Sequence, residues 1–132
     1  MATWDELAEY IRAEYDVISD KPGELRLEYV FDEESDRTQV MIVVREELDR
    51  KYEWVQIATP LGLAKDCDLH RLLETIGQTT VSGGAAIMGE HIVIRHSLPL
   101  ENLDINEFTD PLALIAGAAD NLESEFFGGD NY

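Results

Sequence analysis

Apolar residues recur along the chain with two different spacings, and the change of spacing predicts where helices give way to strands. Near the N-terminus, Thr3 and Glu6 fit a capping box, which satisfies free backbone amides at the start of a helix. The apolar residues behind them share one helical face: Trp4, Leu7, Ala8, Ile11 and Tyr15. A helix is therefore predicted over about 3–16, and the KPG segment at 21–23 predicts a turn.

Three runs with a spacing of two residues predict consecutive strands over 25–31, 38–46 and 52–59, with a polar hairpin turn at 32–36. The middle run is apolar on both faces, which is typical of a strand covered on both sides. We assign part of it to the core face (Val40, Ile42 and Val44) and the rest to the opposite, second face (Met41 and Val43). From the third run, the second face receives Tyr52, Trp54 and Gln56.

The second half of the chain predicts a helix, a hairpin and a final helix. Asp66 or Asp68 caps a short helix over about 66–76, which Gly77 ends, and strands are predicted over 80–88 and 91–98. The last helix starts at Asp104, and Pro111 predicts a break before it continues to about Phe127. The expected fold is one α+β domain, residues 1–132, of order α-β-β-β-α-β-β-α, with helices packed on a mainly antiparallel five-stranded sheet.

The glycine-rich segment Ser82-Gly83-Gly84 does not fit a phosphate-binding loop. Such a loop leads into a helix N-terminus, whereas this segment leads into an apolar run and a hairpin. Glycine within a strand indicates a bulge or a close approach of another backbone. One hypothesis is that the small residues 116–119 of the last helix cross this segment at short range, and a bulge without that contact is the alternative.

Charge narrows the classes of partner. The chain has 132 residues, with 28 acidic and 10 basic side chains and a net charge of −18, and no Lys or Arg follows Arg95. A surplus of this size opposes binding to nucleic acid or an anionic membrane, and favours a basic polypeptide if a charged partner is bound. The N-terminus does not resemble a signal peptide and no apolar run is long enough to span a bilayer, so a cytoplasmic location is expected.

The sequence contains no strong motif for a metal site or a catalytic site. Asp32, Glu34 and Asp36 have calcium-loop spacing, but Arg37 and Val43 occupy positions that require Gly and Glu. The lone cysteine, Cys67, has only His70 near it in sequence, and His91 and His96 are expected on opposite faces of one strand, so no metal, cofactor or disulfide is predicted. Arg95 is expected to pair with an acid of the last helix, with anion recognition as the alternative. Because no base or oxyanion partner can be named for a nucleophile, we predict that the protein is not an enzyme.

The second face is the most informative feature. It is apolar over Val30, Met41, Val43, Tyr52, Trp54 and Val93, and an open patch of this kind is rare on monomers. The short helix, a second subunit or a peptide would cover it. We predict that a partner binds Met41, Val43, Tyr52, Trp54 and Gln56, and that a homodimer contact uses Leu69, Leu72 and Leu73.

The order of elements resembles the type III secretion chaperone-like fold, shared by small acidic chaperones of secretion effectors and by YbjN-type proteins. The residue-level likeness covers about the last third of the chain: an apolar hairpin, Leu98-Pro99-Leu100, an acidic helix start from Asp104 to Glu107, Ala118-Ala119-Asp120, and Leu122-Glu123. The resemblance implies a dimeric, non-catalytic protein that binds a polypeptide over apolar patches, as a chaperone or adaptor. The alternative is a YbjN-type regulatory protein that acts as a self-contained dimer or a small-ligand sensor.

Overall fold

The computed structural model describes residues 3–32, 37–80 and 82–128. Its elements in chain order are α1 (Trp4–Glu14), β1 (Asp16–Lys21), β2 (Glu24–Asp32), β3 (Arg37–Leu48), β4 (Tyr52–Leu63), the short 3-10 helix η1 (Ala64–Asp66), α2 (Leu69–Thr79), β5 (Gly84–Met88), β6 (His91–Pro99) and α3 (Ile105–Phe127). Apart from Asp32, the turn predicted at 32–36 lies outside the described residues.

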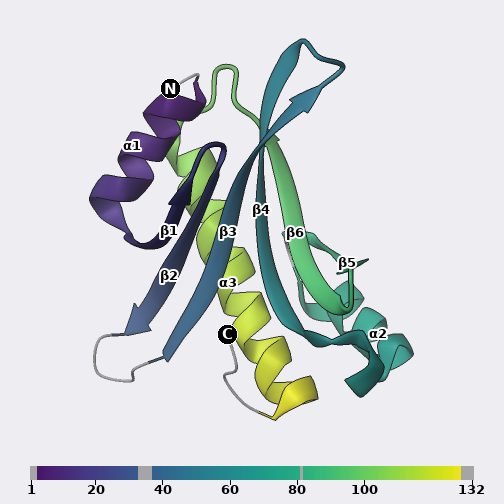
Figure 1. Ribbon diagram of the computed structural model, residues 1–132. Helices are drawn as coiled ribbons and strands as arrows, with labels where there is room; N and C mark the ends of the chain where they lie inside the picture. Colours follow the sequence, from purple (N-terminus) through teal and green to yellow (C-terminus); the bar gives the residue numbers. More distant parts are fainter. Residues whose placement is uncertain (1–2, 33–36, 81, 129–132) are drawn as a thin grey trace.

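The strands form one antiparallel sheet of order β1-β2-β3-β4-β6-β5, so the predicted α+β class and antiparallel sheet are confirmed (Figure 1). The predicted strand count was wrong, because the sheet has six strands rather than five and the order is α-β-β-β-β-α-β-β-α. The additional strand is β1. Its pairing with β2 shifts between Val17 and Ser19, and this bulge breaks the alternation by which a strand is found in a sequence.

A tight hairpin turn sets which side chains of β3 enter the core. Three residues, 49–51, join β3 to β4, and two of them, Asp49 and Arg50, have positive φ (54° and 57°), which is common in short hairpin connections. The resulting register pairs Val43 with Ile57 and Ile42 with Ala58. Because directly paired residues point to the same face, Met41 and Val43 lie on the core side with Ile57. The sequence-based assignment of β3 to its two faces was therefore wrong.

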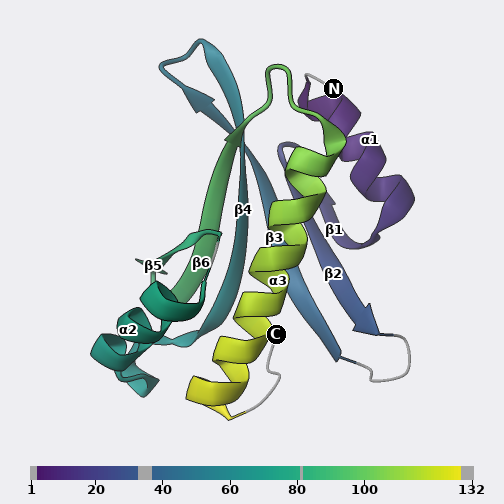
Figure 2. The same ribbon diagram turned by 180° about the vertical axis from the view of Figure 1, so that it is seen from behind.

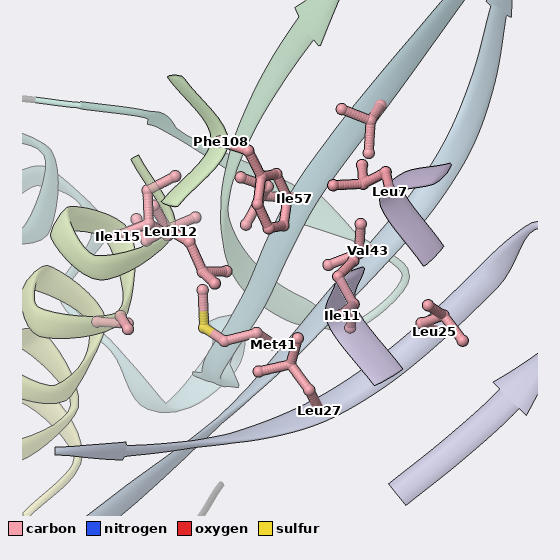
Figure 3. Packing of buried hydrophobic residues seen from close by; sticks show 14 of the residues in the cluster. Leu7, Ile11, Leu25, Leu27, Met41, Val43, Ile57, Phe108, Leu112 and Ile115 are labelled. Atoms are coloured by element: carbon pink, nitrogen blue, oxygen red, sulfur yellow. The ribbon is translucent and has the colours of Figure 1, made fainter. Parts of the chain in front are cut away.

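The core lies between this face of the sheet and the helices α1 and α3. Figure 3 shows Leu7 and Ile11 of α1 and Phe108, Leu112 and Ile115 of α3 directed toward residues of β2, β3 and β4 (Leu25, Leu27, Met41, Val43 and Ile57), all fully buried. The helix α3 passes behind β3 and β4 in Figure 1 and in front of them in Figure 2. The helices α1 and α3 thus cover one face of the sheet and leave the opposite face uncovered.

The last helix is continuous. It begins after Asp104, whose backbone N–H donates to Glu107 Oε1 at 3.0 Å, and runs to Phe127 with Pro111 inside it. The predicted break at Pro111 was wrong. Proline removes one helical hydrogen bond, but Phe108 before it and Leu112 after it are both fully buried, and this packing holds both halves on the sheet. None of the helices in the described ranges has the length and apolar character needed to cross a membrane.

Two glycines mark close approaches to α3. Gly83 has φ +90°, and a Cβ there would lie 3.2 Å from the Arg95 carbonyl oxygen and 3.4 Å from Ile115 Cγ1. A Cβ on Gly62 would lie 2.6 Å from the Phe127 ring, whereas a Cβ on Gly117 would have no neighbour within 4 Å. The last helix therefore approaches the glycine-rich segment, as the hypothesis held, but it does so through Ile115, and Gly117 among the small residues 116–119 makes no close contact.

Candidate functional site

The face of the sheet opposite α1 and α3 carries a broad apolar groove, which we call the open face. A hollow of about 700 Å³ extends across it from β1 to β5. Eight of the twelve residues that line the hollow are apolar: Ile18, Val40, Ile42, Val44, Ala58, Pro60, Met88 and Val93. Ile18 and Met88, at its two ends, are 52% and 46% exposed. The sequence placed an apolar patch on the second face of the sheet, and the structure shows such a patch: Trp54 and Val93 belong to it, whereas Val40, Ile42 and Val44 take the places of Met41 and Val43.

A second hollow continues the groove toward the β3–β4 hairpin. It has a volume of about 260 Å³ and is lined in part by Glu46, Trp54 and Ser97, which follow the residues of the first hollow along β3, β4 and β6. Leu48, which also lines this hollow, pairs with Tyr52, and these side chains are 49% and 45% exposed. The apolar surface of the open face thus follows the length of the two central strands.

The polar groups of β2 on this face are already paired with each other or with neighbours. Arg26 Nε lies 3.5 Å from Glu24 Oε2, and Thr38 Oγ1 donates to Glu28 Oε1 at 3.3 Å. The Arg26–Glu24 pair is partly exposed, and ion pairs of this type contribute about 0–1 kcal/mol to stability. Both pairs border the apolar hollow and do not interrupt it.

Three of the five predicted partner-binding residues lie on the open face and two do not. Tyr52 is at the hairpin end and Trp54 lines the second hollow. Gln56 lines the first hollow, but it is only 5% exposed and its Nε2 donates to Glu46 Oε1 at 2.6 Å. Met41 and Val43 are fully buried against α1 and α3, so they are not available to a partner. Ile42 and Val44, which the sequence placed in the core, take their positions on the open face.

The predicted dimer contact on α2 is also divided. The helix starts after Asp68, which accepts from the backbone N–H of Arg71 at 3.2 Å, and Gly77 lies inside it rather than ending it. Leu72 is fully buried in the core, whereas Leu69 and Leu73 are 38% and 57% exposed. The helix lies beside β5, away from the centre of the open face (Figures 1 and 2). It therefore does not cover the groove.

Arg95 points away from the helix to which the sequence assigned it. It pairs with Ala58 on β4 and Gly84 on β5, so its side chain is on the open face while α3 is on the other. The expected ion pair between Arg95 and an acid of the last helix was wrong. Asp120 of α3 instead pairs with Arg37. Glu125 pairs with Arg71 at 3.2 Å.

A buried polar cluster on the covered side was not predicted. Gln39 Nε2 donates to Thr59 Oγ1 at 2.8 Å and approaches Glu123 Oε1 at 3.5 Å, and all three residues are buried. Thr59 Oγ1 donates in turn to the Val40 carbonyl at 2.8 Å. The cluster joins β3, β4 and α3, and the alternating pattern of β3 could have suggested that Gln39 faces inward. We interpret it as an anchor for α3, because buried polar groups joined in this way fix the relative position of elements.

The positions of the histidines and of the cysteine do not suggest a metal centre. His91 pairs with Leu63 and His96 with Ile57, which places them on opposite faces as predicted. Within the described ranges no three His, Cys, Asp or Glu side chains are placed to hold a metal. Burial raises the pKa of the Cys67 thiol, with a smaller contribution from Asp68, which disfavours the nucleophilic thiolate.

Comparison of the sequence with models of known protein families and with curated proteins gave no match. The resemblance to secretion chaperone-like and YbjN-type proteins therefore stays a prediction.

Proposed function

We propose that the protein is a non-catalytic polypeptide-binding module, chaperone-like or adaptor, that holds a segment of a partner on the open face. The observation that carries this proposal is the apolar hollow of about 700 Å³ on a sheet face that none of the helices in residues 3–32, 37–80 and 82–128 covers. Burying apolar surface supplies the driving force, at roughly 25 cal/mol per Å² removed from water. Contiguous exposed apolar surface on a protein of this size is typical of an interaction site.

The residues that support binding are those at the floor and ends of the groove. Ile42 and Val44 line the floor on β3, Trp54 extends it, and Met88 is exposed at its β5 end. Aromatic side chains and Met are enriched in protein interfaces because they provide large contact areas. The expectation of a basic partner rests on the net charge of −18 and stays a prediction.

A second copy of the chain is the competing occupant, as in a self-contained regulatory dimer. The apolar groove itself favours it, since such a face would be buried equally well by its own copy. The net charge opposes it, because two chains of charge −18 repel each other. A small ligand is the third candidate, since the hollow has the volume of ordinary ligand pockets, about 300–1,000 Å³.

Site-specific photo-cross-linking separates these occupants. A photoreactive phenylalanine analogue would replace Val44 on the open face, or, as a matched control, Leu114, which is 49% exposed on α3. The tagged variants would be irradiated in the cells that contain the protein and analysed by mass spectrometry. We expect adducts with one or a few other polypeptides at position 44 and none of these at position 114.

Adducts at twice 14.9 kDa, the mass of the chain, would show a second copy on the open face and would contradict the proposal in favour of the dimer. The same set of adducts at both positions would show that the open face has no preferred partner. If position 44 gave no adduct and the melting temperature rose with a small molecule, a ligand sensor would replace the proposed function.

A further inference from the structure

One row of side chains across the open face specifies the chemistry of the partner, and this inference rests on the proposed function. We propose that the bound segment is an amphipathic helix whose apolar stripe lies along β3 and β4 and whose acidic flank meets Arg95. The partner would thus carry carboxylates beside its apolar stripe at the point of contact.

The row runs directly across the sheet. Arg26 of β2 pairs with Ile42 of β3, Ile42 with Ala58 of β4, Ala58 with Arg95 of β6, and Arg95 with Gly84 of β5. Directly paired residues of antiparallel strands point to the same face. Two apolar side chains therefore lie between two arginines, and Gly84 has no side chain to cover the outer side of Arg95.

The two arginines differ in whether a carboxylate neutralises their charge. Arg26 lies 3.5 Å from the carboxylate of Glu24. Glu46, another acid on this face, accepts a hydrogen bond from Gln56. Arg95 is partly buried, and in the parts of the chain that the structure describes it makes no ion pair. A guanidinium beside an apolar groove without a counter-ion is a ready donor to a carboxylate, which it can bind with two parallel hydrogen bonds.

The dimensions of the groove fit a helix. From β2 to β6 there are three strand spacings, about 14 Å, and a helix with its side chains is about 10–12 Å wide. From Val40 to Glu46 the groove follows β3 for about 20 Å, which corresponds to about 13 helical residues. A helix lying along the central strands would therefore place its two flanks over Arg26 and Arg95.

The backbone of the partner also favours a helix over an extended segment. The main-chain groups of β3, β4 and β6 are paired within the sheet, so the centre of the open face offers no main-chain hydrogen bonds. An extended segment lying on this apolar surface would leave backbone N–H and C=O groups unpaired, whereas a helix satisfies its own. The other face of the sheet is already covered in this way by α3.

Two hydrocarbon-stapled helical peptides of about 16 residues, with the same Leu and Ala stripe, provide the test. One carries Glu and the other Lys on both flanks of the stripe. Their dissociation constants would be measured by titration calorimetry at fixed salt with the wild-type chain, with Arg95→Glu, and with Lys65→Glu as a control. Lys65 is exposed in η1, so its substitution makes the same change in net charge without altering the row.

We expect the wild type to bind the Glu-flanked peptide about tenfold more tightly than the Lys-flanked peptide, since charge-assisted hydrogen bonds have about that effect. Arg95→Glu should reverse this order, and Lys65→Glu should keep it. The net charge of −18 predicts the opposite preference, so tighter binding of the Lys-flanked peptide by the wild type would overturn the inference. The inference would also be overturned if neither peptide bound, or if the ratio of the two dissociation constants were the same in the wild type and in Arg95→Glu.

A fourth variant separates this inference from the proposed function. Ala58→Arg fills the centre of the groove, and its fold would be checked by circular dichroism, with Val44→Gln as the substitute if it fails to fold. If both peptides bind the wild type equally and Ala58→Arg binds neither, the open face binds polypeptide but Arg95 does not select it. If Ala58→Arg binds both as well as the wild type does, the peptides do not occupy this face, and the inference and the proposed function both fail.

Discussion

Met41 and Ile42 are adjacent in β3 but lie on opposite faces, so the pair tests which face of the sheet is the core. Met41 is fully buried among residues of α1 and α3, whereas Ile42 is partly exposed and lines the groove. Substitution by alanine removes three heavy atoms beyond Cβ in each case. For Met41→Ala the lost transfer free energy and the cavity left behind should lower the free energy of unfolding by about 3 kcal/mol. Ile42→Ala, which leaves no enclosed cavity, should lower it by about 1 kcal/mol.

The two variants would be compared by urea denaturation and by thermal melting, each at two protein concentrations about a hundredfold apart. A difference of about 2 kcal/mol corresponds to melting temperatures roughly 6–10 °C apart for a chain of this length. Equal losses for both variants at the lower concentration would refute the face assignment. A loss for Ile42→Ala that grows with concentration would show that a second copy buries the open face, because only then does stability depend on association.

Three further results are expected. Gly83→Ala should lower the melting temperature, because Gly83 has φ +90° and a Cβ there would press on Ile94 and Ile115. Gly84→Ala should be nearly neutral, because a Cβ on Gly84 meets nothing within 4 Å. Equal changes in melting temperature for the two variants would contradict the close approach of Gly83 to α3. Gly117→Leu should raise the free energy of unfolding by about 0.5–0.8 kcal/mol through helix propensity, and a clear loss in denaturant titration would mean that another group contacts this position. Burial, with smaller contributions from Tyr10, Tyr29 and Glu14, raises the pKa of Tyr15 to about 12. Between pH about 10 and about 12 the unfolded chain loses the phenol proton while the folded chain keeps it, so the free energy of unfolding should fall as the pH rises through this range. Tyr15→Phe should make that fall shallower in urea titrations across this range, and an unchanged slope would contradict the shift.

The sequence was sufficient to predict most elements because their apolar spacing is regular. The helix caps at Thr3 and Asp104, the strands 25–31 and 91–98, and the antiparallel order follow from local patterns that the structure repeats. The exceptions are local departures from those patterns. A bulge at Val17 hides β1, and packing on both sides of Pro111 keeps α3 continuous where the proline alone predicts a break.

The orientation of β3 could not be predicted from its own residues, because it is apolar on both faces. The information lies in the turn and in the next strand. If residues 49–51 are known to form a three-residue connection, Leu48 must pair with Tyr52 and Val43 with Ile57, and Met41 and Val43 then face inward. This segment lacks the glycine by which such connections are usually found in a sequence, so the register could not be fixed. The same register decides that Arg95 shares a face with Ala58.

The acidic side chains are distributed unevenly between the two faces of the sheet. No basic residue follows Arg95, and the exposed acids of α3, among them Glu107, Asp110 and Glu125, lie on the covered side of the sheet. Along β2 and β3 the open face instead has its charges paired locally. Repulsion between the acidic sides acts over a Debye length of about 8 Å at physiological salt and opposes aggregation of whole molecules. A single helix that carries its own carboxylates at the Arg95 edge brings far less negative charge to the surface than a second chain of net charge −18, and for this reason we propose such a segment, rather than a second copy, as the occupant of the groove.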